Sequence, residues 1–132
     1  EQVSSKINEL GLSDKIIFLG QRSDAHDLMQ AVDCILMPSL YEGLSVLLVE
    51  AQAMNVPCIV SDTVSRETDL SKNIIFVNNK DSNAWKEAST FFLSKKDRNS
   101  NNDSLKNNGY DIACETERVM ELLEKGVTNN NG

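Results

Sequence analysis

Ser39-Leu40-Tyr41-Glu42-Gly43-Leu44-Ser45-Val46-Leu47-Leu48-Val49-Glu50-Ala51 is the stretch around which we expect the fold to be organised. The apolar run before it, Cys34–Met37, ends at a proline and is typical of a buried strand. Good helix formers fill Val46–Met54, which contains neither glycine nor proline. The residues between them predict a strand-to-helix turn, in which Gly43 relaxes the backbone and Ser45 is the N-cap.

Two carboxylates in this stretch point to a function. A helix that begins directly after a parallel strand directs its free N–H groups to the carboxyl edge of the sheet, where an anion such as a diphosphate is held. Glu42 lies in the turn, and Glu50 lies in a helix that is apolar nearly all round and is therefore expected to be buried. Eight helical residues separate them by about 12 Å, whereas the acid/base pairs of glycoside hydrolases stand roughly 5–9.5 Å apart. The spacing better suits two hydroxyl-rich groups flanking a diphosphate, as in a nucleotide-sugar.

Length and charge limit the function classes further. The 132 residues suffice for one domain with one core, and the formal net charge of −7 argues against nucleic acid or an anionic membrane as the main partner. A bound phosphate would have to be held locally by backbone donors, or by basic residues supplied from outside this chain. Cys34, Cys58 and Cys114 show no metal-ligand spacing, and the first two are expected to be small core residues in a reducing compartment.

Strands and helices are expected to alternate, which predicts an α/β fold with a Rossmann-like parallel sheet and flanking helices. One domain over residues 1–126 and a disordered tail over 127–132 are expected, with a mobile loop over 95–108. Asp24 and Asp81 are expected to cap helices, and Asn55 is expected to end one in the left-handed conformation. The predicted helices cover residues 1–12, 23–32, 46–54, 82–93 and 105 or 110–125. The predicted strands cover residues 15–20, 34–37, 58–61 and 74–77, with a turn or short helix at 64–70.

A family resemblance rests on three segments, Pro38–Gly43, Glu50–Ala53 and Val56–Asp62. Together they resemble the C-terminal donor-binding domain of retaining glycosyltransferases of the GT-B fold, in the group 1 or family 4 set and its bacterial surface-polysaccharide branch. The spacing from Glu42 to Glu50 matches the E-x7-E signature of that family. Two glutamates eight apart are common by chance, but within a strand, turn, helix and second strand the signature is specific.

The resemblance also implies that the chain is a partial domain. In the family, two further strands precede the position of Glu1, and they would lie between the strands at 15–20 and 34–37. They carry a Gly-Arg turn and a lysine that hold the donor phosphates. The acceptor site would lie in a missing N-terminal domain, so the chain is expected to be inactive alone.

The implied reaction is transfer of a sugar from a nucleotide-diphosphate sugar, a UDP-sugar in particular, to a polysaccharide or lipid-linked acceptor with retention. No metal or cofactor is expected, and the location would be cytoplasmic, with contact to the inner face of the membrane through the missing domain. Two alternatives stay open. One is a GT-B nucleotide-sugar epimerase, and the other is a non-catalytic α/β nucleotide-binding module.

Site residues follow from the same resemblance. Glu42 would act at the donor sugar or phosphates, against the alternative of an exposed turn carboxylate. Glu50 would accept hydrogen bonds from the ribose hydroxyls, against the alternative of a helix glutamate satisfied by backbone groups. His26 is expected to be a surface residue. The remaining donor-binding candidates are Gln21, Arg22, Gly43, Leu44, Ser45 and Val46, although many family members carry proline where this chain has Ser45.

Overall fold

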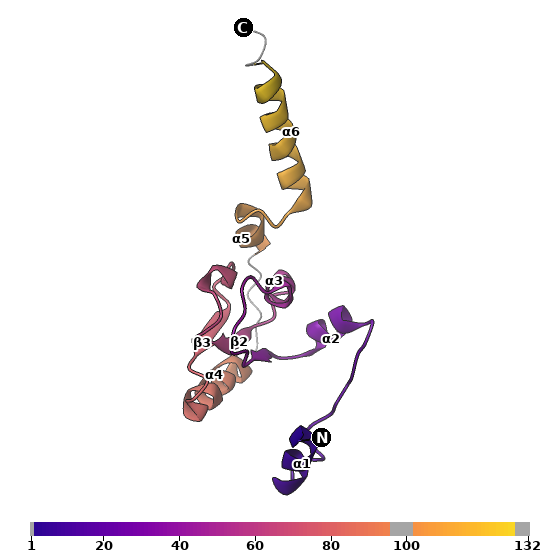
Figure 1. The fold of residues 1–132 in the computed structure, drawn as a ribbon, viewed down its shortest axis with the longest axis vertical. Helices are drawn as coiled ribbons and strands as arrows, with labels where there is room; N and C mark the ends of the chain where they lie inside the picture. The colour runs from indigo at the N-terminus through magenta and orange to yellow at the C-terminus, as the bar shows by residue number, and fades with distance from the viewer. Residues whose placement is uncertain (1, 96–101, 129–132) are drawn as a thin grey trace.

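A parallel three-stranded sheet forms the centre of the computed structural model, which describes residues 2–95 and 102–128 (Figure 1). Its strands are β1 (Ile35–Met37), β2 (Cys58–Ser61) and β3 (Ile74–Val77), in the order β1-β2-β3. Cys58 pairs with Ile35 on one side and with Ile74 on the other. These three strands confirm three of the four predicted ones, and the α/β class with its parallel sheet is confirmed.

Helices flank this sheet and extend beyond it. They are α1 (Gln2–Glu9), α2 (Ala25–Ala31), α3 (Val46–Ala53), the 3-10 helix η1 (Arg66–Thr68), α4 (Ser82–Ser94), α5 (Asn102–Asn107) and α6 (Ile112–Thr128). Figure 1 shows α1 and α6 projecting away from the sheet in different directions. The expected loop at 95–108 is wrong where α5 forms, and its residues 96–101 lie outside the described ones. The predicted tail at 127–132 overlaps the end of α6, its residues 129–132 lie outside the described part, and the domain boundary stays a prediction.

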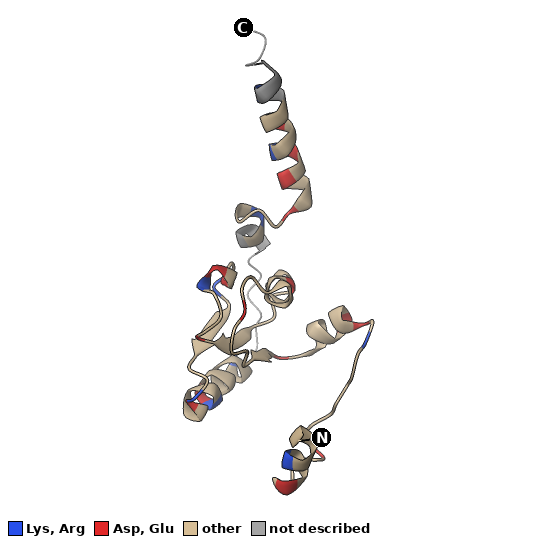
Figure 2. Cartoon of the chain, in the orientation of Figure 1, with Lys and Arg blue, Asp and Glu red and all other residues tan. Residues whose placement is uncertain are grey.

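Both faces of the sheet are covered, as expected for parallel strands. On one face α3 packs through Leu48 and Ala51, and on the other α4 packs through Ala88 and Phe92. Cys58 is fully buried among these apolar groups, and burial raises the pKa of its thiol to about 12. It is therefore a small core residue, as predicted. The three strands carry no charged side chain, and the charges lie on helices and connecting segments (Figure 2).

Two predicted helix ends, at Asp81 and at Asn55, are confirmed. Asp81 caps α4, because its Oδ1 accepts hydrogen bonds from the backbone N–H groups of Asn83 and Ala84 at 3.1 and 3.0 Å. Asn55 follows α3 with a φ of 56°, the left-handed conformation that its position predicted. Asp24 precedes α2 but its side chain makes no cap hydrogen bond. Its carboxylate accepts a hydrogen bond from Arg22 instead, and this bond lowers the pKa of Asp24.

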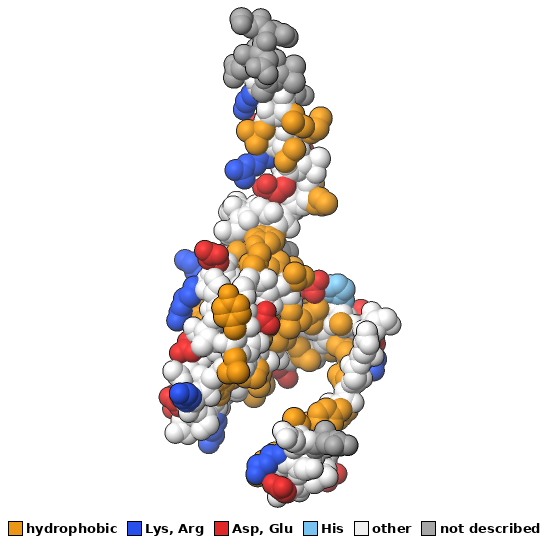
Figure 3. Space-filling view, in the orientation of Figure 1, with side chains coloured by type: hydrophobic (Ala, Val, Ile, Leu, Met, Phe, Trp, Pro, Cys, Tyr) orange, Lys and Arg blue, Asp and Glu red, His pale blue; other side chains and the backbone are white. Residues whose placement is uncertain are grey.

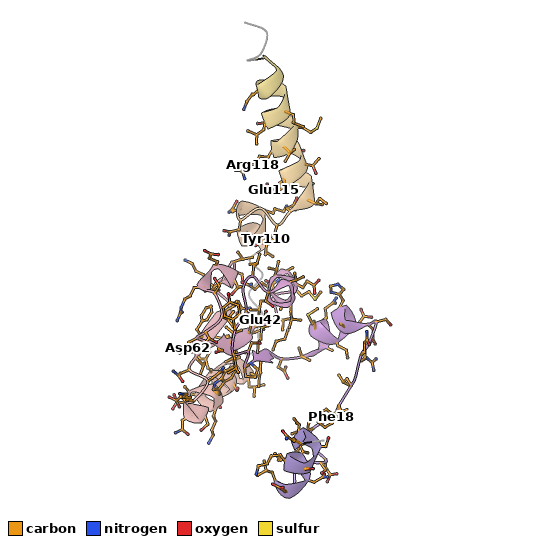
Figure 4. All side chains as sticks on the ribbon, viewed as in Figure 1. Phe18, Glu42, Asp62, Tyr110, Glu115 and Arg118 are labelled. Atoms are coloured by element: carbon orange, nitrogen blue, oxygen red, sulfur yellow. The ribbon has the colours of Figure 1, made fainter. Side chains whose placement is uncertain are left out.

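The strand predicted over Lys15–Gly20 is wrong. These residues form an exposed, extended segment between α1 and α2, and Ile17 is 81% exposed. Figure 4 shows Phe18 close to α1 and far from the sheet. A strand is stable only when a neighbour satisfies its N–H and C=O groups. No described residues supply such a neighbour, because the sheet ends at β1 on this side.

A buried amide fixes α3 on the sheet. Gln52 is 1% exposed, and its Nε2 donates hydrogen bonds to the carbonyl oxygens of Leu48, at 2.9 Å, and Thr68, at 2.7 Å. Its Oε1 accepts from the backbone N–H groups of Leu70 and Ser71, both at 2.9 Å, and from the Ser71 hydroxyl. One side chain thus ties α3 to the connection between β2 and β3. This constraint sets where the N-terminal end of α3 lies relative to the sheet.

We expect Gln52→Met to lower the free energy of unfolding by about 3 kcal/mol, because backbone groups in the β2–β3 connection lose their partners. Gln21→Met is the matched control, since Gln21 is exposed. Urea denaturation monitored by circular dichroism measures both. Equal stabilities of the two variants would show that the Gln52 contacts do not hold α3.

Candidate functional site

Hydrogen bonds join the loops at the carboxyl edge of the sheet. The carbonyl oxygen of Ser39, just after β1, accepts from Thr63 Oγ1 at 3.0 Å and from Asn79 Nδ2 at 3.2 Å. Thr63 follows β2, and its hydroxyl lies 2.7 Å from Ser61 Oγ. Asn79 follows β3. The loop that leads to α3 is therefore held at its start by the ends of both other strands.

Glu42 is fixed through its backbone in the middle of that loop. It forms a parallel bridge with Val64, and its carbonyl oxygen accepts from the N–H of Ser65 at 3.4 Å. Glu42 is half-buried, and Figure 4 places it beside the sheet. The preceding Tyr41 is 84% exposed. The structure therefore holds the main chain at Glu42 in place at the carboxyl edge, as predicted for this loop.

Gly43 does not supply the backbone freedom that we expected of it. The glycines with positive φ are Gly11, Gly20 and Gly109, so the prediction that Gly43 relaxes the turn is wrong. A Cβ built on Gly43 would meet no atom within 4 Å. The fold alone thus tolerates a side chain here. The glycine leaves open space next to the entry of α3.

The N-terminus of α3 lacks a side-chain cap from its N-cap residue. Ser45 occupies the N-cap position, as predicted, but its hydroxyl makes no cap hydrogen bond. The side chain is buried, while Leu44 and Val46 on either side are exposed. The first-turn N–H groups of a helix carry partial positive charge and need an acceptor. The Leu48 N–H donates to the Ser45 carbonyl oxygen at 3.1 Å, so the N–H groups of Val46 and Leu47 are the ones left for an external anion.

Glu50 lies on the exposed side of α3, so the expectation that it is buried is wrong. Its side chain is 38% exposed, because α3 turns Leu48, Ala51 and Gln52 toward the sheet instead. His26 on α2 lies with Nε2 4.0 Å from Glu50 Oε1. The histidine is exposed, as predicted, and is the pale-blue side chain next to an acidic one in Figure 3. The Glu50 carboxylate is therefore within reach of solvent and of a ligand.

Gln21 and Arg22 stand apart from the turn that leads into α3. Both are exposed, just before α2, and Arg22 Nε donates to Asp24 Oδ1 at 2.7 Å. Figure 1 shows this part of the chain away from the sheet. The His26–Glu50 pair joins α2 to α3. A nucleotide contact by Gln21 or Arg22 stays a prediction.

Thr63, Asn79 and Gln52 were not foreseen as residues that shape the site. Each left a signal in the sequence. Thr63 and Asn79 are polar residues that directly follow parallel strands, and Gln52 is a polar residue inside an apolar helix. Polar side chains at such places are hydrogen-bonded when they are buried.

Within residues 2–95 and 102–128, no group of three or more His, Cys, Asp or Glu side chains is placed to hold a metal ion. None of the described helices is both long and apolar enough to span a membrane.

The sequence of the chain matches a known protein family. The family model described as Glycosyl transferases group 1 matches residues 1–95, which include the sheet, the turn at Glu42 and α3. The chain belongs to this family. The match confirms the resemblance deduced from the sequence.

Curated relatives of this glycosyltransferase family match over different lengths of the chain. The Bacillus subtilis protein EpsF is 39% identical over 74 residues, 56% of the chain and 19% of EpsF. The Escherichia coli UDP-Gal:alpha-D-GlcNAc-diphosphoundecaprenol alpha-1,3-galactosyltransferase is 30% identical over 129 residues, 92% of the chain and 33% of that protein. The O-antigen chain mannosyltransferase RfbU of Salmonella typhimurium is 33% identical over 82 residues, 61% of the chain and 23% of RfbU. The chain thus spans about a third or less of the length of these relatives.

Thr63→Val should loosen the loop that carries Glu42, because Ser39 and Ser61 lose a hydrogen bond worth about 1 kcal/mol. Cleavage by chymotrypsin after Tyr41 should become about fivefold faster, since more of the population has the loop open. Mass spectrometry of the products measures this rate. Thr90→Val is the control, because the Thr90 hydroxyl bonds only within α4, to the carbonyl of Lys86. An unchanged rate for Thr63→Val would contradict the assigned role.

Proposed function

We propose that this chain binds the donor of a glycosyl transfer reaction, a nucleotide-diphosphate sugar with UDP as the nucleotide. The sugar passes, with retention of configuration, to a polysaccharide or lipid-linked acceptor. The observation that carries the proposal is the open helix N-terminus of α3 at the carboxyl edge of a parallel sheet, with a carboxylate on either side of it.

The N-terminus of α3 supports binding of the diphosphate. Ser45 gives it no side-chain cap, and the glycine at 43 leaves space for close approach to the backbone. In group transfer the bond between the sugar C1 and the diphosphate oxygen breaks, and a bond from C1 to an acceptor hydroxyl forms. Negative charge develops on the leaving diphosphate, and the helix dipole stabilises it where it develops. The acceptor proton leaves to solvent or to the diphosphate.

The two carboxylates support a division of the donor into two parts. Glu42 lies before the helix N-terminus, and Glu50 lies in the second turn of α3. We assign Glu42 to the donor sugar and Glu50 to the ribose hydroxyls, because a carboxylate accepts strong hydrogen bonds from hydroxyl groups. The exposure of Glu50 favours this role over a helix glutamate satisfied by backbone groups.

The names of relatives support the substrate class. The Escherichia coli relative that matches most of this chain is named for a UDP-Gal donor and a diphosphoundecaprenol-linked acceptor. RfbU is named for the O-antigen chain. These names favour UDP as the nucleotide and a lipid-linked or polysaccharide acceptor for this chain.

Titration of the chain with UDP, followed by heteronuclear magnetic resonance, tests the proposal. Amide shifts should cluster at residues 42–50, with a dissociation constant on the order of 1 mM. Glu50→Ala should weaken binding by roughly 1.5–3 kcal/mol, because charge-assisted hydrogen bonds to the ribose are lost. Glu87→Ala, an exposed change on α4, should leave binding intact. Shifts confined to other residues would contradict the donor site.

The same titration with UDP-galactose separates the roles of the two carboxylates. Glu42→Gln should keep the affinity for UDP within a factor of about two and remove the additional shifts that the sugar causes. Equal loss of UDP binding in the Glu42 and Glu50 variants would show that the division is wrong.

A further inference from the structure

A hollow lies at the carboxyl edge of the sheet, on the α4 side of the Glu42 loop. Its volume is about 450 Å³, and the lining residues are Pro38, Leu40, Asn79, Ser82 and Trp85. Small-molecule sites commonly measure roughly 300–1,000 Å³ and combine aromatic walls with a few polar groups. This hollow has both features, and nothing in the proposed donor site uses it.

The aromatic wall is held in a fixed orientation. Trp85 is half-buried in the first turns of α4, and its Nε1 donates a hydrogen bond to the carbonyl oxygen of Asn78 at 3.1 Å. The side chain also packs against the core of the α4 side, next to Ala88 and Phe92. The indole is therefore positioned before any ligand arrives, which lowers the entropy lost on binding.

Two polar residues, Asn79 and Ser82, also line the hollow. Asn79 Nδ2 donates to the carbonyl oxygens of Ser39, at 3.2 Å, and Pro38, at 3.4 Å, which fixes the amide plane. Asn79 Oδ1 is buried and has no hydrogen-bond partner. A buried acceptor without a donor is costly, but this oxygen is enclosed by the protein and does not face the hollow. Ser82, an exposed hydroxyl at the start of α4, is a second polar group in the lining.

We propose that this hollow binds a hexopyranose ring of the carbohydrate substrate. A pyranose has C–H groups that pack on an aromatic face and hydroxyl groups around its edge. Trp85 and Leu40 provide the apolar contact, and the exposed hydroxyl of Ser82 hydrogen-bonds to one hydroxyl of the ring. No lining residue is charged, which disfavours a phosphate or a free nucleotide.

The position of the hollow fits this role, which rests on the proposed function. α3 and α4 cover opposite faces of the sheet, and both helices begin after the carboxyl ends of strands, as does the loop from Ser39 to Glu42. The diphosphate would lie on the α3 side and the pyranose on the α4 side. Leu40 lines the hollow only two residues before Glu42. Such a ring is either the sugar of the donor or a sugar of the acceptor, and the experiment separates the two.

Trp85 is the only tryptophan of the chain, so its fluorescence reports on this hollow directly. Methyl glycosides of galactose, mannose and N-acetylglucosamine serve as probes, with glycerol as a control for hydroxyl groups without a ring. At least one glycoside should change the emission saturably, with a dissociation constant on the order of 1–10 mM. No change with any glycoside up to about 100 mM, ten times that range, would overturn the proposal, as would an equal change with glycerol.

Variants measured by magnetic resonance titration give the second test. Trp85→Leu should weaken glycoside binding at least tenfold, and Trp85→Phe, which keeps an aromatic face, should weaken it less. Phe91→Leu is the matched control, because Phe91 is an exposed aromatic residue on the same helix and does not line this hollow. Unchanged binding in Trp85→Leu, or equal loss in Phe91→Leu, would contradict the assignment.

Competition distinguishes the two sources of the ring and the two proposals. Glycoside binding that persists in saturating UDP-galactose identifies an acceptor sugar, and binding that UDP-galactose displaces identifies the donor sugar. Both support the subsite. Quenching of Trp85 by UDP alone, without an effect of the glycosides, would place the nucleotide here and overturn it. If UDP shifts residues 42–50 while no glycoside binds, the donor site holds and only this inference fails.

Discussion

The arrangement of the candidate site depends on the buried amide of Gln52. Its hydrogen bonds satisfy backbone groups of the β2–β3 connection that apolar side chains could not satisfy. They also fix the rotation of α3 about its axis. Because Gln52 and Glu50 lie two residues apart on one helix, they point in different directions. Burying the amide therefore keeps the Glu50 carboxylate at the surface, where it is accessible to a ligand.

A hydroxyl group after β2 and an amide group after β3 likewise fix the position of the loop that carries Glu42. Thr63 and Asn79 both donate to the carbonyl of Ser39, so the loop starts from a fixed point. Three parallel strands end at one edge of the sheet, and each contributes a polar residue there. Such an edge is where open α/β sheets bind ligands. The donor proposal and the pyranose proposal describe the two sides of this one loop.

Much of the fold was predictable from sequence because local signals agreed with the global arrangement. The apolar runs of β2 and β3, the Asp81 cap and the left-handed Asn55 are examples of such agreement. The strand at Lys15–Gly20 failed because an apolar run reveals a tendency to pair but not whether a neighbour is present. The burial of Glu50 failed for another reason. Its apolar neighbours suggested a helix covered on all sides, whereas Val46 and Leu47 are themselves exposed. The hydrogen bonds to the carbonyl of Ser39 come from Thr63 and Asn79, which lie 24 and 40 positions further along the chain. Local sequence patterns do not reveal contacts over such separations.

A crystal structure of the chain soaked with UDP would locate the diphosphate and the ribose independently. The diphosphate should lie at the N-terminus of α3, and a ribose hydroxyl should lie within about 3.2 Å of a Glu50 carboxylate oxygen. A nucleotide bound elsewhere on the chain, with both the α3 N-terminus and Glu50 left to solvent, would contradict the proposed donor site.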